Sequence, residues 1–100
     1  MGARIAVDRE KVIDFCRRNH ILKLSLFGSV LRDDFRPDSD VDVLLEFEEG
    51  HVVGFFGLAR LERELSELFG RRTDLRTPEE LSRYFRRQVL ESAEPLYARG

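Results

Sequence analysis

Two short motifs in this chain carry residues that could bind a phosphate and a metal ion. Gly28-Ser29 follows one apolar stretch, and Asp40 and Asp42 open another, with residues 30–39 between them. Alternate residues of a strand point to the same face with Cα atoms roughly 6.6–6.8 Å apart, so the two aspartates are expected side by side. Paired carboxylates suit a hard divalent cation, and a glycine-serine turn offers N–H groups and a hydroxyl to a phosphate. The pattern indicates phosphoryl or nucleotidyl transfer.

The elements that must position these motifs follow from apolar periodicity and turn residues. In chain order we predict a helix over residues 8–19, a strand over 21–27, a possible short helix over 29–32, a loop over 33–39 and a strand over 40–47. These are followed by a turn over 48–51, a helix over 55–68, a strand over 71–76 and a broken helix over 77–93. Asp8 is the expected N-cap of the first helix, and Pro95 is expected to prevent the last one from continuing. This order predicts an α/β (α+β) fold, a small mixed sheet flanked by helices.

The apolar positions predict which faces turn inward. The expected core positions are Val12, Ile13, Phe15 and Cys16 in the first helix, Leu22, Leu24 and Leu26 in the first strand, Val41, Val43, Leu45 and Phe47 in the second, and Leu58, Leu61, Leu65 and Leu68 in the second helix. Asp40, Asp42, Leu44 and Glu46 occupy the other face of the second strand. Buried unpaired carboxylates are costly, so that face is expected to border a wet cleft. Core packing is also the default for Phe55 and Phe56, with exposure of one of them at a partner surface as the alternative.

Composition narrows the class of protein. One hundred residues, 42% hydrophobic and 36% charged, fit one compact domain over residues 1–100. The net charge of −2 argues against a dedicated nucleic-acid binder, and no apolar run approaches the roughly 20 residues that span a bilayer. Cys16 is the single cysteine, so no internal disulfide can form and a buried thiol is expected. A cytoplasmic location is therefore predicted.

At these motifs the chain resembles the minimal nucleotidyltransferases (MNT) of the polymerase-β-like superfamily, including the MntA-like antitoxins of HEPN/MNT toxin–antitoxin pairs. The matching residues are Leu26-Phe27-Gly28-Ser29, Arg32, Ser39-Asp40-Val41-Asp42-Val43-Leu44, Thr73-Asp74-Leu75 and Thr77-Pro78-Glu79. The resemblance implies the polymerase-β-like nucleotidyltransferase fold. It also implies Mg²⁺-dependent transfer of AMP from ATP to a hydroxyl, here a tyrosine of a HEPN-domain toxin.

The resemblance assigns roles to individual residues. Asp40, Asp42 and Asp74 become catalytic metal ligands of a site for two Mg²⁺ ions. Gly28, Ser29 and Arg32 become nucleotide-binding residues. Two departures from the family pattern are Val30 directly after the glycine-serine pair and Arg76 soon after Asp74. Arg71, Arg72 and Arg76 could help to hold phosphate, as could Arg83, Arg86 and Arg87, although a solvated face is the commoner role for such residues.

Two other functions stay open on the sequence. One is a non-catalytic antitoxin that neutralises its partner by binding alone; the intact set of aspartates disfavours it. The other is a small-molecule nucleotidyltransferase that works as an oligomer or with a separate acceptor-binding subunit.

Overall fold

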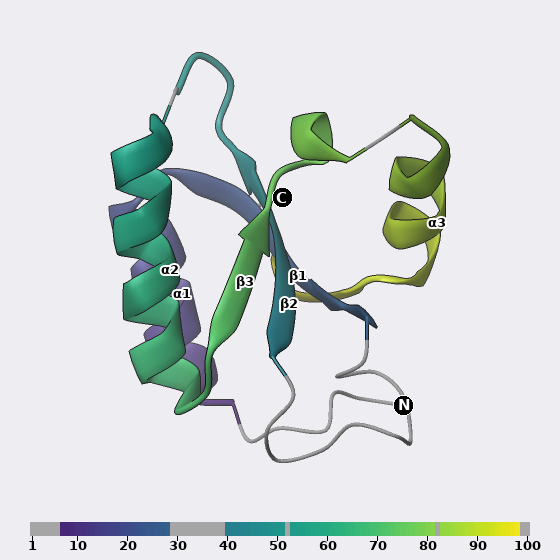
Figure 1. Cartoon of the computed structure of the whole chain (residues 1–100). Coiled ribbons are helices and arrows are strands. Elements are labelled where there is room, and N and C mark those ends of the chain that lie inside the picture. Colours follow the sequence, from purple (N-terminus) through teal and green to yellow (C-terminus); the bar gives the residue numbers. More distant parts are fainter. Residues whose placement is uncertain (1–6, 29–39, 52, 82, 99–100) are drawn as a thin grey trace.

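The computed structural model describes residues 7–28, 40–51, 53–81 and 83–98. The elements are α1 (Arg9–Arg18), β1 (Ile21–Phe27), β2 (Val41–Phe47), α2 (Phe55–Phe69), β3 (Thr73–Arg76), the 3₁₀ turn η2 (Pro78–Glu80), α3 (Arg83–Ser92) and β4 (Glu94–Ala98). The strands form one sheet in the order β3-β2-β1-β4 (Figure 1). β1 runs antiparallel to β2 and β4, whereas β2 and β3 are parallel. The predicted small mixed sheet with flanking helices is confirmed.

Strand β4 is missing from the predicted order of elements. Pro95 does end the helical pattern, but the chain then pairs with β1, where Leu24 faces Tyr97 and Leu26 faces Glu94. A register shift in β1 between Leu24 and Ser25 lies beside Pro95. Proline is tolerated here because β4 is an edge strand. The short segment shows no clear alternation of polar and apolar residues, so only pairing with β1 reveals it as a strand.

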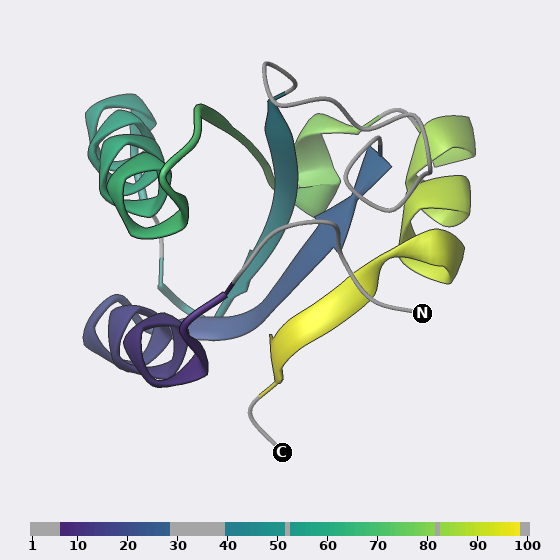
Figure 2. The same ribbon diagram turned by 90° about the horizontal axis from the view of Figure 1, so that it is seen from below.

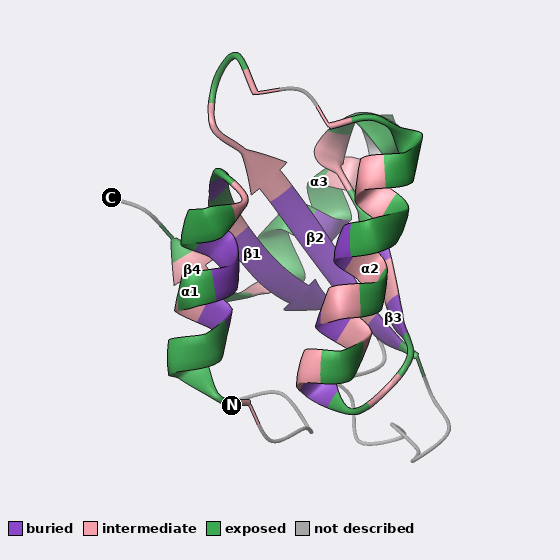
Figure 3. Cartoon of the chain, turned by 90° about the vertical axis from the view of Figure 1, so that its left-hand side faces the viewer, coloured by how far each residue is buried: buried purple, intermediate pink, exposed green. Residues whose placement is uncertain are grey.

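Helices cover both faces of the sheet. α1 and α2 lie on one face and α3 lies on the other (Figure 2). The larger core forms under α1 and α2, whose buried sides turn toward the sheet (Figure 3). A smaller cluster on the opposite face consists of Phe27, Leu44, Leu81 and Val89. The strand that begins beside the aspartates is therefore held between two apolar layers.

The alternation predicted for β2 is confirmed, but the one predicted for β1 is wrong at its start. Val41, Val43 and Leu45 are buried in the larger core, and Leu44 turns to the smaller cluster. Leu22 is 38% exposed because the pairing with β2 shifts register between Ile21 and Lys23. The irregularity places Ile21 in the core instead of Leu22.

Polar contacts fix α2 against the edge strand β3. The N–H of Thr73 donates to Oγ of Ser66 at 2.9 Å, and the N–H of Leu75 donates to Oε2 of Glu62 at 3.0 Å. These helix side chains satisfy strand N–H groups that would otherwise be free at the sheet edge. After α2, Gly70 adopts a left-handed φ of 70°, as expected of the glycine that ends a helix.

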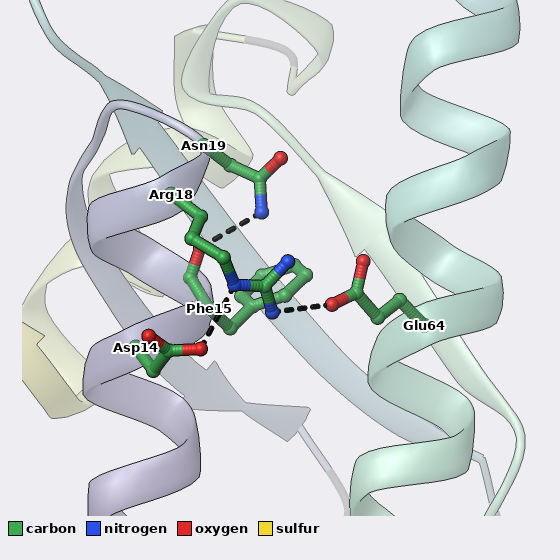
Figure 4. A network of polar contacts seen from close by, with 5 residues as sticks. All are labelled: Asp14, Phe15, Arg18, Asn19 and Glu64. Carbon is green, nitrogen blue, oxygen red and sulfur yellow. Dashed lines mark hydrogen bonds and ion pairs between the residues drawn. The ribbon is translucent and has the colours of Figure 1, made fainter.

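Arg18 links the two helices on this face. Its Nη2 donates to Oε2 of Glu64 on α2 at 2.6 Å, and its Nε donates to Oδ2 of Asp14 at 2.8 Å (Figure 4). The hydrogen bond to Glu64, followed by the one to Asp14, raises the pKa of Arg18. At the start of α1, Asp8 accepts from the N–H of Lys11, which confirms the predicted N-cap.

Phe55 and Phe56 contradict the expectation of core packing. Their exposed fractions are 81% and 86%, and the two rings contact each other edge to face at 5.8 Å between centroids. We expect Phe55→Ser and Phe56→Ser to change the free energy of unfolding by no more than about 0.5 kcal/mol, since surface substitutions away from special features have small effects. Urea denaturation checks this, with Phe69→Ser as the buried control that must be strongly destabilising.

The predicted buried thiol of Cys16 is confirmed, and it makes stability depend on pH. Burial raises the pKa of Cys16 from 9.0 to about 12. As the pH rises, the thiol ionises in the unfolded chain before it ionises in the folded chain. The contribution of the buried neutral thiol to the free energy of unfolding is therefore complete below about pH 9. It is lost as the pH rises toward 12, by up to about 1.4 kcal/mol per pH unit. Urea denaturation between pH 8 and 11 should show a steeper loss for the native chain than for Cys16→Ala. Equal slopes would contradict the prediction.

Candidate active site

The three predicted carboxylates gather at one end of the sheet. Asp42 on β2 is the register partner of Asp74 on the parallel strand β3, and Asp40 directly precedes β2. The N–H of Val41 donates to the carbonyl oxygen of Arg72 at 2.9 Å, which aligns the starts of the two strands. Neighbouring strands lie about 4.8 Å apart, so the backbones that carry Asp42 and Asp74 are close.

Gly28 lies directly against Asp42. It follows Phe27, the register partner of Asp42 on β1, and has a φ of +79°. A Cβ atom built at Gly28 would overlap Oδ2 of Asp42. Both the backbone conformation and the contact therefore require glycine at this position. The structure brings the end of β1 to the carboxylates, as the sequence predicted for a phosphate-binding turn.

The carboxylates are open to solvent. Asp40 is exposed, and Asp42 and Asp74 are half-buried. Further along the same face of β2, Leu44 is covered by the smaller apolar cluster. The apolar cover over Leu44 thus separates the aspartates at the beginning of β2 from Glu46, which is half-buried further along the same face.

The donor set suits Mg²⁺ held jointly with a nucleotide. Within residues 7–28, 40–51, 53–81 and 83–98, no three His, Cys, Asp or Glu side chains are close enough together to hold a metal ion by themselves. Mg²⁺ is usually bound by one or two carboxylates, with substrate phosphates and water completing its coordination. Asp42 and Asp74 on adjacent strands, beside the close backbone approach at Gly28, match that requirement.

Arg76 contacts one of the predicted ligands. Its Nη2 donates to Oδ2 of Asp74 at 3.1 Å in an ion pair that is partly exposed. A metal ion on Asp74 has to compete with this guanidinium. The family departure at residue 76 therefore has a direct structural consequence at the site.

We expect Arg76→Ala to tighten Mg²⁺ binding several-fold, since an exposed ion pair is worth up to about 1 kcal/mol. Isothermal titration of Mg²⁺ in the presence of a non-hydrolysable ATP analogue measures the effect. Arg17→Ala removes the same charge from an exposed position on α1 and serves as the control. Weaker binding in Arg76→Ala would instead show that Arg76 contacts the nucleotide.

An open pocket adjoins the carboxylates on the side of β3. Its volume is about 490 Å³, and its lining residues are Asp40, Ala59, Glu62, Arg63, Ser66, Arg72, Thr73 and Asp74. Sequence reasoning did not identify Arg63, since it lies on the polar side of α2. Glu62, Arg63 and Ser66 follow one another at helical spacing beside the leucine stripe, but nothing in that pattern shows that they face β3.

Ser29 and Arg32 lie outside the described residues, so their roles in nucleotide binding stay predictions. In the part of the chain that the structure describes, no helix is long and apolar enough to cross a membrane.

Comparison with known proteins shows which proteins this chain is similar to. A family model for the nucleotidyltransferase domain matches residues 9–96. A Methanocaldococcus jannaschii protein described as a candidate protein adenylyltransferase is 31% identical over 85 residues, which cover 85% of this chain and 89% of that protein.

Two solved structures share the fold. The structure of a candidate minimal nucleotidyltransferase superposes with a TM-score of 0.72 and 40% identity, over 87% of each chain. A chain from a complex of tri-AMPylated Shewanella oneidensis HEPN toxin with MNT antitoxin superposes with a TM-score of 0.67 and 21% identity, over 90% of this chain and 69% of that one. The second likeness concerns the fold alone.

Proposed function

Because the chain belongs to the nucleotidyltransferase domain family, we propose that it transfers AMP from ATP to a hydroxyl group of a partner protein. The observation that carries this proposal is the register pairing of Asp42 with Asp74 beside Gly28. Carboxylates on neighbouring strands, next to a backbone that a triphosphate can approach closely, form the constellation that nucleotidyl transfer needs.

In the proposed reaction, the acceptor oxygen forms a bond to the α-phosphorus as the bond to the β-phosphate breaks. Pyrophosphate leaves, and the hydroxyl proton passes to solvent. Bound Mg²⁺ would neutralise the phosphate oxygens and the charge on the attacking and leaving groups. Asp40, Asp42 and Asp74 would hold the metal together with the nucleotide phosphates, while Gly28 allows the phosphates to approach. Ser29 and Arg32 would complete the nucleotide contacts.

We further propose that the acceptor is a tyrosine of a HEPN-type toxin, which makes the chain an antitoxin. The protein described as a candidate adenylyltransferase supports a protein acceptor, and a chain of the same fold lies in a complex with an AMPylated HEPN toxin. Within the described residues there is no second folded unit that could bind a separate small-molecule acceptor. A protein acceptor would bring its own binding surface.

The proposal is tested by incubating the purified chain with a co-encoded HEPN-domain protein, ATP and Mg²⁺. Intact-mass spectrometry should show the partner heavier by one or more AMP units, and peptide mapping should locate them on tyrosine. An unmodified partner would overturn the proposal. Neutralisation of the toxin that persists in Asp42→Asn would instead identify an antitoxin that acts by binding alone.

A further inference from the structure

We propose that the acceptor reaches the site from the β3 side, through the pocket beside Asp74, and that Arg63 and Arg72 select an acidic segment around the acceptor hydroxyl. This inference rests on the proposed function and extends it to the class of acceptor. It is argued from the order of groups across the sheet and from the two arginines, which line the pocket together with the carboxylates of Asp40, Glu62 and Asp74.

The groups of the site lie in a fixed order across the sheet, from β1 through β2 to β3. Gly28 at the end of β1 contacts one side of Asp42, and Asp74 on β3 is paired on the other side. In phosphoryl transfer the attacking and leaving oxygens lie roughly in line, on opposite sides of the phosphorus atom. If the departing pyrophosphate lies toward Gly28, the acceptor hydroxyl must approach from the side of Asp74.

A pocket is present on that side. It includes Asp40 and Asp74 in its lining, whereas Asp42 is not among its lining residues. Its volume of about 490 Å³ falls within the range of about 300–1,000 Å³ found for ligand sites. A tyrosine side chain with part of its flanking peptide would fit a space of this size.

Two arginines in this pocket are available to bind an anion. The side chains of Arg63 and Arg72 are exposed, and neither makes an ion pair or hydrogen bond with any residue that the structure describes. Other arginines of the fold are engaged, for example Arg18 with Glu64 and Arg76 with Asp74. A guanidinium that lines a pocket and pairs with no described residue is suited to a carboxylate, which it can bind through two parallel hydrogen bonds.

Both arginines line the pocket, and contacts between α2, β2 and β3 fix their backbone positions. Arg72 is held at the start of β3 because its carbonyl oxygen accepts from Val41 on β2. Arg63 lies between Glu62 and Ser66, the two α2 residues whose side chains accept from β3. Glu62 also lines the pocket, but its Oε2 is bound to the N–H of Leu75. A solvated face would explain each arginine alone; their shared position beside Asp74 points to a ligand.

The test is an NMR titration with three acetylated, amidated peptides that each contain one tyrosine, flanked by glutamates, alanines or lysines. Mg²⁺ is present and nucleotide is absent, so binding is measured without transfer. We expect the glutamate peptide to bind about tenfold more tightly than the lysine peptide, as one charge-assisted contact allows. Its binding should shift the amide signals of Ser66, Thr73 and Asp74.

The variant Arg63→Gln/Arg72→Gln should erase this preference. Arg17→Gln/Arg60→Gln removes the same charge from exposed positions outside the pocket and should keep it. Equal affinity for the three peptides, shifts confined to another surface, or a preference that survives Arg63→Gln/Arg72→Gln would overturn the inference. A chain that shows the preference but modifies no partner protein would overturn the proposed function and retain the acidic specificity of the pocket.

Discussion

Asp42→Asn is expected to lower the rate of AMP transfer by on the order of 10³-fold or more, because metal coordination contributes several kcal/mol to phosphoryl transfer. Asparagine keeps the size of the side chain and removes its charge, so the fold should persist. Asp42 is central to the site, since Gly28 contacts it from one side and Asp74 is paired with it on the other. Single-turnover transfer with labelled ATP and the partner protein measures the loss.

Glu46→Gln provides the matched control for this prediction. It makes the same change from acid to amide on the same strand, four residues beyond Asp42 and away from Gly28. We expect transfer by Glu46→Gln to stay within about twofold of the native rate, as for a half-buried charge that lies outside the site. If Asp42→Asn kept native transfer while Glu46→Gln lost it, the proposed site would be in the wrong place.

Gly28→Ala is expected to destabilise the fold by about 2–3 kcal/mol and to abolish transfer. Alanine at a φ of +79° is strained, typically by about 1 kcal/mol. Its Cβ would also overlap the carboxylate of Asp42, so either that side chain or the end of β1 must move. Urea denaturation measures the first effect, and Mg²⁺-dependent binding of an ATP analogue measures the second.

Gly50→Ala separates backbone strain from the contact with Asp42. Gly50 has a similar φ of +83°, but a Cβ there would meet no atom within 4 Å. We expect it to cost about 1 kcal/mol and to leave nucleotide binding intact. Equal behaviour of the two variants would mean that the closeness of Gly28 to Asp42 has no role in the site.

Local patterns in the sequence were sufficient for most of the fold. Asp8 begins a helix because its side chain accepts a backbone hydrogen bond, and Gly70 ends one because it adopts a left-handed conformation. Each of these effects depends on a single residue. The alternation along β2 places Val41, Val43 and Leu45 on one face because one strand separates two apolar layers. The predictions are wrong where pairing between strands determines the structure. The register shift between β1 and β2 exposes Leu22, and β4 is a strand because it pairs with β1.

The site was predicted only in part for the same reason. The spacing of Asp40 and Asp42 indicated their shared face, and the family resemblance indicated Asp74. The sequence also placed Gly28 near the carboxylates, but its direct contact with Asp42 and the presence of Arg63 in the pocket depend on how β1 and α2 pack, which no local pattern specifies. Asp42 and Asp74 become neighbours through the parallel register of β2 and β3.

The ties between α2 and β3 also determine where the length of this chain can change over evolution. The hydroxyl of Ser66 accepts a hydrogen bond from the N–H of Thr73, which fixes β3 relative to α2. An insertion between Gly70 and Arg72 would therefore shift the register that pairs Asp74 with Asp42. The turn at residues 48–51 lies beyond the other end of β2, away from the carboxylates. Homologues that retain activity should therefore vary in length at that turn and keep a constant distance between α2 and the third aspartate.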